Sequence, residues 1–188
     1  DVFAPVARTT TWRLLLSIAG DRDYRVSHYD IKMAFLNGTL EEEIYLKPPP
    51  GYDRGNKVYK LKKSLYGLKQ AANVWNKTLH NSLIKNGCVQ DDTDKCLYKK
   101  IWNRKICFVL VHVDDMLVAT NDEMFRDDLM KSVGNDFEIK DLGQVKHYLG
   151  IEVERTKDGE FLISQTAFID KIVKEAGFEE AKVQKNPI

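Results

Sequence analysis

Hydrophobic residues recur along the chain at two spacings, and these spacings predict where helices and strands form. The helical spacing, which gives a helix one buried face, occurs in residues 9–19, 69–85, 121–133 and 164–176. In the first of these segments the predicted buried face consists of Trp12, Leu15, Leu16 and Ala19. In the third, Asn121 is predicted as the N-cap, and Glu123 lies in the first turn, where a carboxylate stabilises a helix.

Short runs that alternate or are wholly apolar predict strands. They cover residues 24–30, 44–46, 58–61, 96–101, 106–113, 116–119, 137–139, 148–154 and 160–163. Turn-forming residues separate several of them, at Pro48–Gly51, Asn103-Arg104 and Lys157-Asp158-Gly159. The order of elements, β-α-β-β-α, predicts an α+β fold in which helices cover one face of an antiparallel sheet.

The composition is that of an ordinary globular domain, with 43% hydrophobic and 30% charged residues in a chain of 188. No apolar run approaches the ~18 residues of a membrane helix, and no secretory signal opens the chain. Because the sequence starts at Asp1 rather than Met, we interpret it as a fragment or a processed product. The cysteines at positions 88, 96 and 107 are odd in number and form no CxxC pair, which favours reduced thiols over a zinc site.

The net charge of +1 conceals a strongly basic stretch. Residues 54–90 contain eight Lys or Arg residues and no Asp or Glu, so they carry +8 and leave −7 for the remainder of the chain. A basic stretch between acidic flanks is typical of a surface that binds a polyanion beside a metal-binding centre. A solvated lysine-rich surface without a ligand explains the same charge equally well.

Two adjacent aspartates, Asp114 and Asp115, lie between two strand-like runs and are predicted at the tip of a β-hairpin. Their charges repel, so both remain ionised only beside a cation or ample solvent. Grouped carboxylates are the ligands that Mg²⁺ prefers, together with water and substrate phosphates. Asp30, which also ends a strand-like run, is the candidate for a third ligand. On its own the Asp-Asp pair is more simply explained as a solvated turn, and spacing alone does not show that the three residues meet.

Several long motifs resemble those of copia-type retrotransposon reverse transcriptases, in the same order and over nearly the whole chain. They are Phe3–Arg8, Tyr29–Gly38, Glu42–Tyr45, Lys62–Ala71, His112–Asp115, Asp141–Gly143 and Tyr148–Ile151. The resemblance implies an RNA-directed DNA polymerase with a right-hand fold. Residues 1–155 would form the palm with part of the fingers, and residues 156–188 would begin the thumb. The same family would place integrase and RNase H regions in one polyprotein with this chain, and finger strands before Asp1.

The resemblance also implies roles for individual residues. Asp30, Asp114 and Asp115 would be the catalytic metal ligands, with the Ile31 carbonyl as a further ligand of two Mg²⁺ ions, for which Mn²⁺ substitutes. Phe35 would exclude the ribose 2′-hydroxyl of the incoming dNTP, and Tyr66 and Gly67 would line the nucleotide pocket. The alternative for Phe35 is an ordinary core residue, and Tyr66 could equally be a packing aromatic. Contacts with the template or primer would come from Lys62, Lys63, Lys69, Gln70, Tyr148, Leu149 and Gly150. Lys140 corresponds only loosely to a lysine that protonates pyrophosphate.

Two positions depart from the family pattern: His112 stands where Tyr is commoner, and Ala72 stands where relatives outside the copia group have Pro. Two other classes of function are consistent with the aspartates: a remnant that only binds nucleic acid, and a different two-metal enzyme such as a nuclease or nucleotidyl cyclase. The motifs at Tyr66–Lys69 and Tyr148–Gly150 favour the polymerase. For the polymerase the expected partners are dNTPs and a primed RNA or DNA template, with no membrane, in a cytoplasmic virus-like particle or the nucleus.

Overall fold

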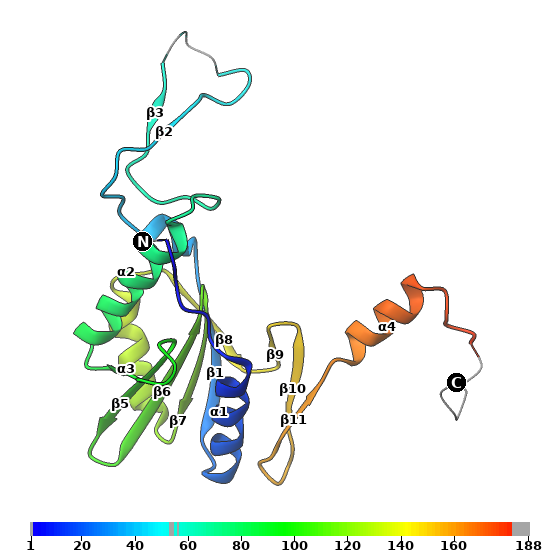
Figure 1. The fold of residues 1–188 in the computed structure, drawn as a ribbon. Coiled ribbons are helices and arrows are strands. Elements are labelled where there is room, and N and C mark those ends of the chain that lie inside the picture. The colour runs from blue at the N-terminus through cyan, green and yellow to red at the C-terminus, as the bar shows by residue number, and fades with distance from the viewer. Residues whose placement is uncertain (1, 53–54, 56, 182–188) are drawn as a thin grey trace. The chain divides into compact units, whose positions relative to one another are not determined.

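The computed structural model describes residues 2–52, 55 and 57–181. The chain divides into two compact units, residues 1–144 and residues 145–188, and each is described by itself (Figure 1). Arg54 of the basic stretch lies outside the described residues.

A six-stranded antiparallel sheet forms the centre of the first unit, with the strand order β4-β5-β6-β7-β1-β8. The strands are β1 (Arg25–Ile31), β4 (Val89–Gln90), β5 (Leu97–Trp102), β6 (Lys105–His112), β7 (Asp115–Thr120) and β8 (Ile139–Gln144). The predicted mixture of helices with antiparallel sheet is therefore confirmed. The two-residue strand β4 was not predicted.

Helices cover both faces of this sheet. The helices α2 (Ala71–Lys85) and α3 (Glu123–Gly134) contribute Trp75, Leu79, Leu83, Leu129, Met130 and Val133 to the main core. Because side chains alternate along a strand, Leu117 and Ala119 of β7 point away from that core, yet both are fully buried. Helix α1 (Thr9–Asp21) packs against β1 and β7 on that opposite face (Figure 1).

The prediction that all helices cover one face was therefore wrong for α1. The physical reason lies in β7, whose residues from Met116 to Thr120 are all buried. A strand that is apolar on both faces needs cover on both faces.

An extended segment, called the ribbon below, connects β1 to α2 and spans residues 32–70. It contains the 3-10 helix η1 (Ala34–Asn37), β2 (Tyr45–Leu46) and β3 (Tyr59–Lys60), and β2 pairs with β3 in antiparallel fashion. A backbone bridge between Thr39 and Lys63 closes its base. The strands β2 and β3 agree with the predicted runs, whereas η1 was not predicted.

The second unit contains a three-stranded antiparallel sheet of β9 (His147–Tyr148), β10 (Ile151–Arg155) and β11 (Phe161–Ser164), followed by α4 (Thr166–Glu175). The predicted single strand at 148–154 was wrong, since Leu149 and Gly150 both have positive φ, 50° and 78°, and form a tight turn. The predicted turn before β11 is confirmed, with Gly159 at φ 90°. The apolar residues Phe168, Ile169 and Ile172 of α4 are exposed.

Two further predictions were wrong in detail. The N-cap of α3 is Asp122, whose carboxylate accepts from the Phe125 amide at 2.8 Å, whereas the Asn121 side chain bonds to the Ile106 amide instead. The strand predicted at 137–139 lies at 139–144, because Phe137 belongs to the core and its ring meets that of Trp75 edge-on at 5.1 Å. Among the described residues, no helix has the length and apolarity to cross a membrane.

Candidate active site

The turn between β6 and β7 consists of only two residues, Val113 and Asp114, because His112 and Asp115 are already paired across the hairpin. So short a connection needs a positive φ, and Val113 supplies it at 58°. A β-branched residue rarely adopts this conformation, which costs on the order of 1–3 kcal/mol. The strain is thus located directly beside the two aspartates.

Hydrogen bonds from outside the hairpin hold both carbonyls of this turn. The indole Nε1–H of Trp75, on α2, donates to the Val113 carbonyl at 2.6 Å. The backbone amide of Ile31, at the end of β1, donates to the Asp114 carbonyl at 2.9 Å. The turn is therefore fixed from a helix on one side and from a strand on the other.

The register of β1 and β7 brings the third aspartate to the same place. Asp30 is the direct cross-strand partner of Asp115, so both side chains lie on the same face of the sheet. On the other side of β1, Asp30 is paired with Lys140 of β8. Asp115, Asp30 and Lys140 consequently form a row across three neighbouring strands.

His28 is a site residue that the sequence analysis did not find. Its Nε2 lies 2.7 Å from Oδ1 of Asp115, and the two side chains are 15% and 30% exposed. It precedes Asp30 by two positions and so shares its face of β1. Because side chains alternate along a strand, the sequence could have shown that His28 shares a face with Asp30. It could not show that His28 contacts Asp115, which lies far away in the sequence.

Burial raises the pKa of Asp114, and the negative charges of Asp115 and Asp30 act in the same direction, against the lowering effect of its own backbone amide. A cation beside these carboxylates would relieve both unfavourable effects, so the donor chemistry of these residues suits a divalent metal. The side chains do not gather around one point, however: the described residues contain no cluster of three or more His, Cys, Asp or Glu arranged to hold a metal ion. One oxygen of Asp115 is engaged with His28 instead.

The predicted nucleotide-binding residues lie on two neighbouring segments. The rings of Phe35, on η1, and Tyr66 are tilted by 44° with centroids 5.8 Å apart, and Tyr66 is 89% exposed. Gly67 follows in the left-handed region, at φ 96°. Gly38 brings η1 against α2, since a Cβ there would lie 2.6 Å from Cγ1 of Val74.

The predicted template contacts are only partly gathered. Lys62, Lys63 and Lys69 are exposed between β3 and α2, and Gln70 donates to a carboxylate oxygen of Glu42 at 3.3 Å. Elsewhere in the basic stretch, Lys60 pairs with Glu43, and Lys85 pairs with Asp136 at 3.3 Å. The stretch therefore extends over the ribbon and along α2, and it is partly neutralised.

In the second unit, Tyr148 is 1% exposed, whereas the turn residues Leu149 and Gly150 are exposed. Of these three predicted primer-binding residues, the two at the tip of the β9–β10 hairpin are thus accessible.

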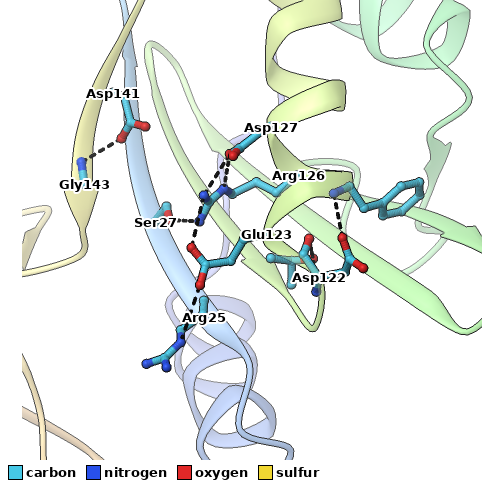
Figure 2. A network of polar contacts seen from close by, with 10 residues as sticks. Arg25, Ser27, Asp122, Glu123, Arg126, Asp127, Asp141 and Gly143 are labelled. Atoms are coloured by element: carbon cyan, nitrogen blue, oxygen red, sulfur yellow. Dashed lines mark hydrogen bonds and ion pairs between the residues drawn. The ribbon is translucent and has the colours of Figure 1, made fainter.

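A polar network supports β1 from the side of α3. Arg126 reaches from α3 to Oγ of Ser27 at 2.9 Å and is flanked by Glu123 and Asp127 (Figure 2). Its side chain is only 11% exposed. It lies near Tyr29, whose pKa burial raises to about 12. The network anchors the strand that carries Asp30.

Next to this network, β8 contains a bulge opposite the same part of β1. Ser27 pairs with Gln144 but Tyr29 pairs with Asp141, so β8 has one residue more than β1 in this interval. The carboxylate of Asp141 accepts from the Gly143 amide at 2.7 Å, and Gly143 has φ 77° (Figure 2). The Asp141–Gly143 motif therefore shapes the strand that carries Lys140.

A mixed fold with antiparallel sheets, in which a central hairpin presents two aspartates beside a third, is consistent with a reverse transcriptase domain. Comparison with known families matches residues 1–188 to the family described as reverse transcriptase (RNA-dependent DNA polymerase), so the chain belongs to this family. The resemblance to copia-type retrotransposon enzymes is also confirmed by the curated relatives.

The relatives are transposon proteins of plants and yeast. The Retrovirus-related Pol polyprotein from transposon RE1 of Arabidopsis thaliana is 35% identical over 93% of this chain, and that from transposon TNT 1-94 of Nicotiana tabacum is 34% identical over 100%. A transposon Ty5-1 protein of Saccharomyces cerevisiae is 32% identical over 85% of the chain and 53% of its own length. The chain spans only 12% and 14% of the two plant polyproteins.

Proposed function

We propose that this chain is the catalytic region of an RNA-directed DNA polymerase, which adds nucleotides from dNTPs to a primer 3′-hydroxyl on an RNA or DNA template. The observation that carries the proposal is the row of Asp30 against Asp115, with the Asp114 carbonyl held by the Ile31 amide, in a chain of the reverse transcriptase family. In this proposal residues 1–155 are the palm with part of the fingers, and residues 156–188 begin the thumb.

Asp30, Asp114 and Asp115, with the Ile31 carbonyl, would hold two Mg²⁺ ions, or Mn²⁺ in their place. Bound there, the metal would supply positive charge against the triphosphate and the reacting oxygens. The raised pKa of Asp114 is consistent with this assignment, because burial and then the charges of Asp115 and Asp30 disfavour its ionised form, which a bound cation would stabilise. Asp30 and Asp115 share one face of the sheet, from which the primer terminus and the dNTP would approach.

Other residues would bind and orient the substrates. Phe35 beside Tyr66 would form the wall that rejects a ribose 2′-hydroxyl, and Gly67 would allow close approach of the backbone. Lys140, paired with Asp30 in the sheet, would be the candidate to donate a proton to the departing pyrophosphate. Contacts with template and primer phosphates would come from Lys62, Lys63, Lys69 and Gln70, and at the primer end from the hairpin of Tyr148, Leu149 and Gly150.

The remaining expectations concern the longer polyprotein. Integrase and RNase H regions would act with this chain, and synthesis would take place in a cytoplasmic particle. The first of these proposals is based on the Pol polyprotein relatives, of whose length this chain spans only a small share.

Primer extension with Mg²⁺ and dNTPs, on RNA and DNA templates, tests the function. We expect Asp114→Asn to reduce extension by at least about 1,000-fold, since the carboxylate acts on the transition state, while affinity for primed template changes less than about threefold. Asp128→Asn, an exposed position on α3, is the matched control and should extend normally. Retained extension by Asp114→Asn would overturn the assignment. Cleavage without extension would indicate a nuclease, and binding alone a remnant.

A further inference from the structure

Side-chain packing restrains the strained residue Val113 only weakly. Val113 has φ 58°, its side chain is 38% exposed, and the turn contains only one other residue. A cavity of about 110 Å³ lies next to it, lined in part by Pro5, Trp75, Val111 and Val113. The two-residue hairpin requires this conformation, but close packing does little to hold Val113 in it, so hydrogen bonds to the turn have to oppose the strain.

The indole of Trp75 is suited to that task. It is 2% exposed within the main core, and the ring of Phe137 meets it edge-on, at 77° and 5.1 Å. The donor is thus fixed by helix α2 and by the core before it meets the turn. Its hydrogen bond to the Val113 carbonyl, at 2.6 Å, acts on the strained residue itself.

We propose that Trp75 is a positioning residue for nucleotidyl transfer: its indole N–H holds Val113 in the left-handed conformation and thereby directs the carboxylates of Asp114 and Asp115. The proposal rests on the proposed function, because it assigns Trp75 a part in the same site. Without the bond, Val113 moves toward the cavity and the peptide group that precedes Asp114 rotates. The aspartates then lose their alignment with Asp30, although the amide of Ile31 still holds the Asp114 carbonyl.

The sharpest test removes the donor and nothing else. Replacement of Trp75 by 3-benzothienylalanine keeps the size of the ring and exchanges N–H for sulfur. The same replacement at Trp102, which is 66% exposed, is the matched control. Trp75→Phe is a second variant, which also enlarges the cavity.

Two measurements are made on the whole chain. With ¹³C-labelled valine methyl groups, NMR reports the conformation of Val113 without any metal or substrate. Single-nucleotide incorporation then gives kcat and KM. We expect the benzothienylalanine chain to show shifted or exchange-broadened Val113 methyl signals and a kcat about tenfold lower, the size of one lost hydrogen bond, with KM for dNTP within about twofold. A purely structural role would instead lower thermal stability and leave the kcat of the folded fraction unchanged.

Val113→Gly provides the rescue, because glycine adopts a positive φ without strain. In this background the replacement of Trp75 should change kcat by less than about twofold. The proposal is overturned if the folded benzothienylalanine chain retains normal Val113 signals, or if the loss of kcat is as large with glycine as with valine. Should the unaltered chain incorporate no nucleotide, the proposed function fails, while the Val113 signals still decide whether Trp75 holds the turn.

Discussion

At the scale of single residues, the site combines a strained backbone with unfavourable charge. Val113 has a positive φ, and the pKa of Asp114 is raised by burial and then by two neighbouring aspartates. Both features cost stability in the metal-free protein, and such costs are typical of functional sites. The chain should therefore become more stable when a side chain that causes such a cost is replaced.

We therefore predict that Asp114→Asn stabilises the chain in the absence of divalent ions. The amide has nearly the same shape and lacks the charge that burial disfavours. We expect the Tm at pH 7 to rise by only about 1–3 °C, because Asp114 is exposed and solvent screens much of the unfavourable charge. Thermal unfolding in EDTA measures it, and Asp128→Asn, which removes an exposed charge, should leave Tm within about 1 °C.

The pH dependence of this difference has a defined sign. A carboxyl group whose folded pKa lies above its unfolded value destabilises the fold at high pH, and protonation relieves the cost as pH falls through the folded pKa. The Tm advantage of Asp114→Asn should therefore shrink as pH is lowered from 7 toward 4. An advantage that grows at low pH, or a variant less stable than the parent at pH 7, would contradict the assignment.

At the scale of elements, Asp94 joins the first helix to the sheet. Its carboxylate accepts from Thr11 Oγ1 at 2.5 Å, from the Arg8 amide at 3.1 Å and from the Cys96 amide at 2.9 Å. Helix α1 has no N-cap side chain of its own, so Asp94 satisfies its amino end from a distant loop. The carboxylate is thereby a structural group with three donors in a buried place.

We predict that Asp94→Ala destabilises the chain by about 2–4 kcal/mol, because three donors lose a charged acceptor, and that Asp94→Asn costs less. Burial would raise the pKa of Asp94, but the hydrogen bonds outweigh it and hold the pKa below its usual value. Asp94 thus stabilises the folded chain at neutral pH, and this stabilisation is lost as pH falls below about 4. Urea unfolding at pH 7 and pH 3 measures both effects. Asp92→Asn, at a fully exposed neighbour, is the control.

The sequence predicts elements well where the periodicity is local and poorly where a distant partner decides. The helices α1 and α2 and the hairpin strands β5, β6 and β7 follow from their spacing. The turn at Leu149, which separates β9 from β10, could not be predicted in this way, because Leu gives no indication of a left-handed conformation. The placement of α1 depends on the burial of both faces of β7, which is a property of the sheet.

The same distinction applies to the site. The motifs identified Asp30, Asp114 and Asp115, and the register of β1 and β7 brings their backbones together, whereas their roles stay predictions. His28 and Trp75 were not found, because each acts on a residue far along the chain. Lys140 was assigned only loosely, and its place beside Asp30 depends on the bulge in β8.

At the scale of the whole molecule, charge is distributed unevenly around a net value of +1. The described lysines of the basic stretch are all exposed, but Lys60 and Lys85 already have carboxylate partners. The lysines between β3 and α2 should therefore be the main groups that displace counterions from the phosphates on binding. Affinity for nucleic acid would then depend on salt through a small number of positions.

We predict that Lys62→Gln with Lys63→Gln lowers the salt dependence of binding to primed template. Two lost phosphate contacts should reduce the slope of log K against log salt by about 1.4–1.8, with the loss of affinity similar for all sequences. Fluorescence anisotropy between about 50 and 200 mM salt measures the slope. Lys85→Gln with Lys95→Gln removes the same charge from lysines that are paired with Asp136 and Asp92, and its slope should stay unchanged. Equal changes in both variants would mean that binding responds to net charge rather than to the lysines that precede α2.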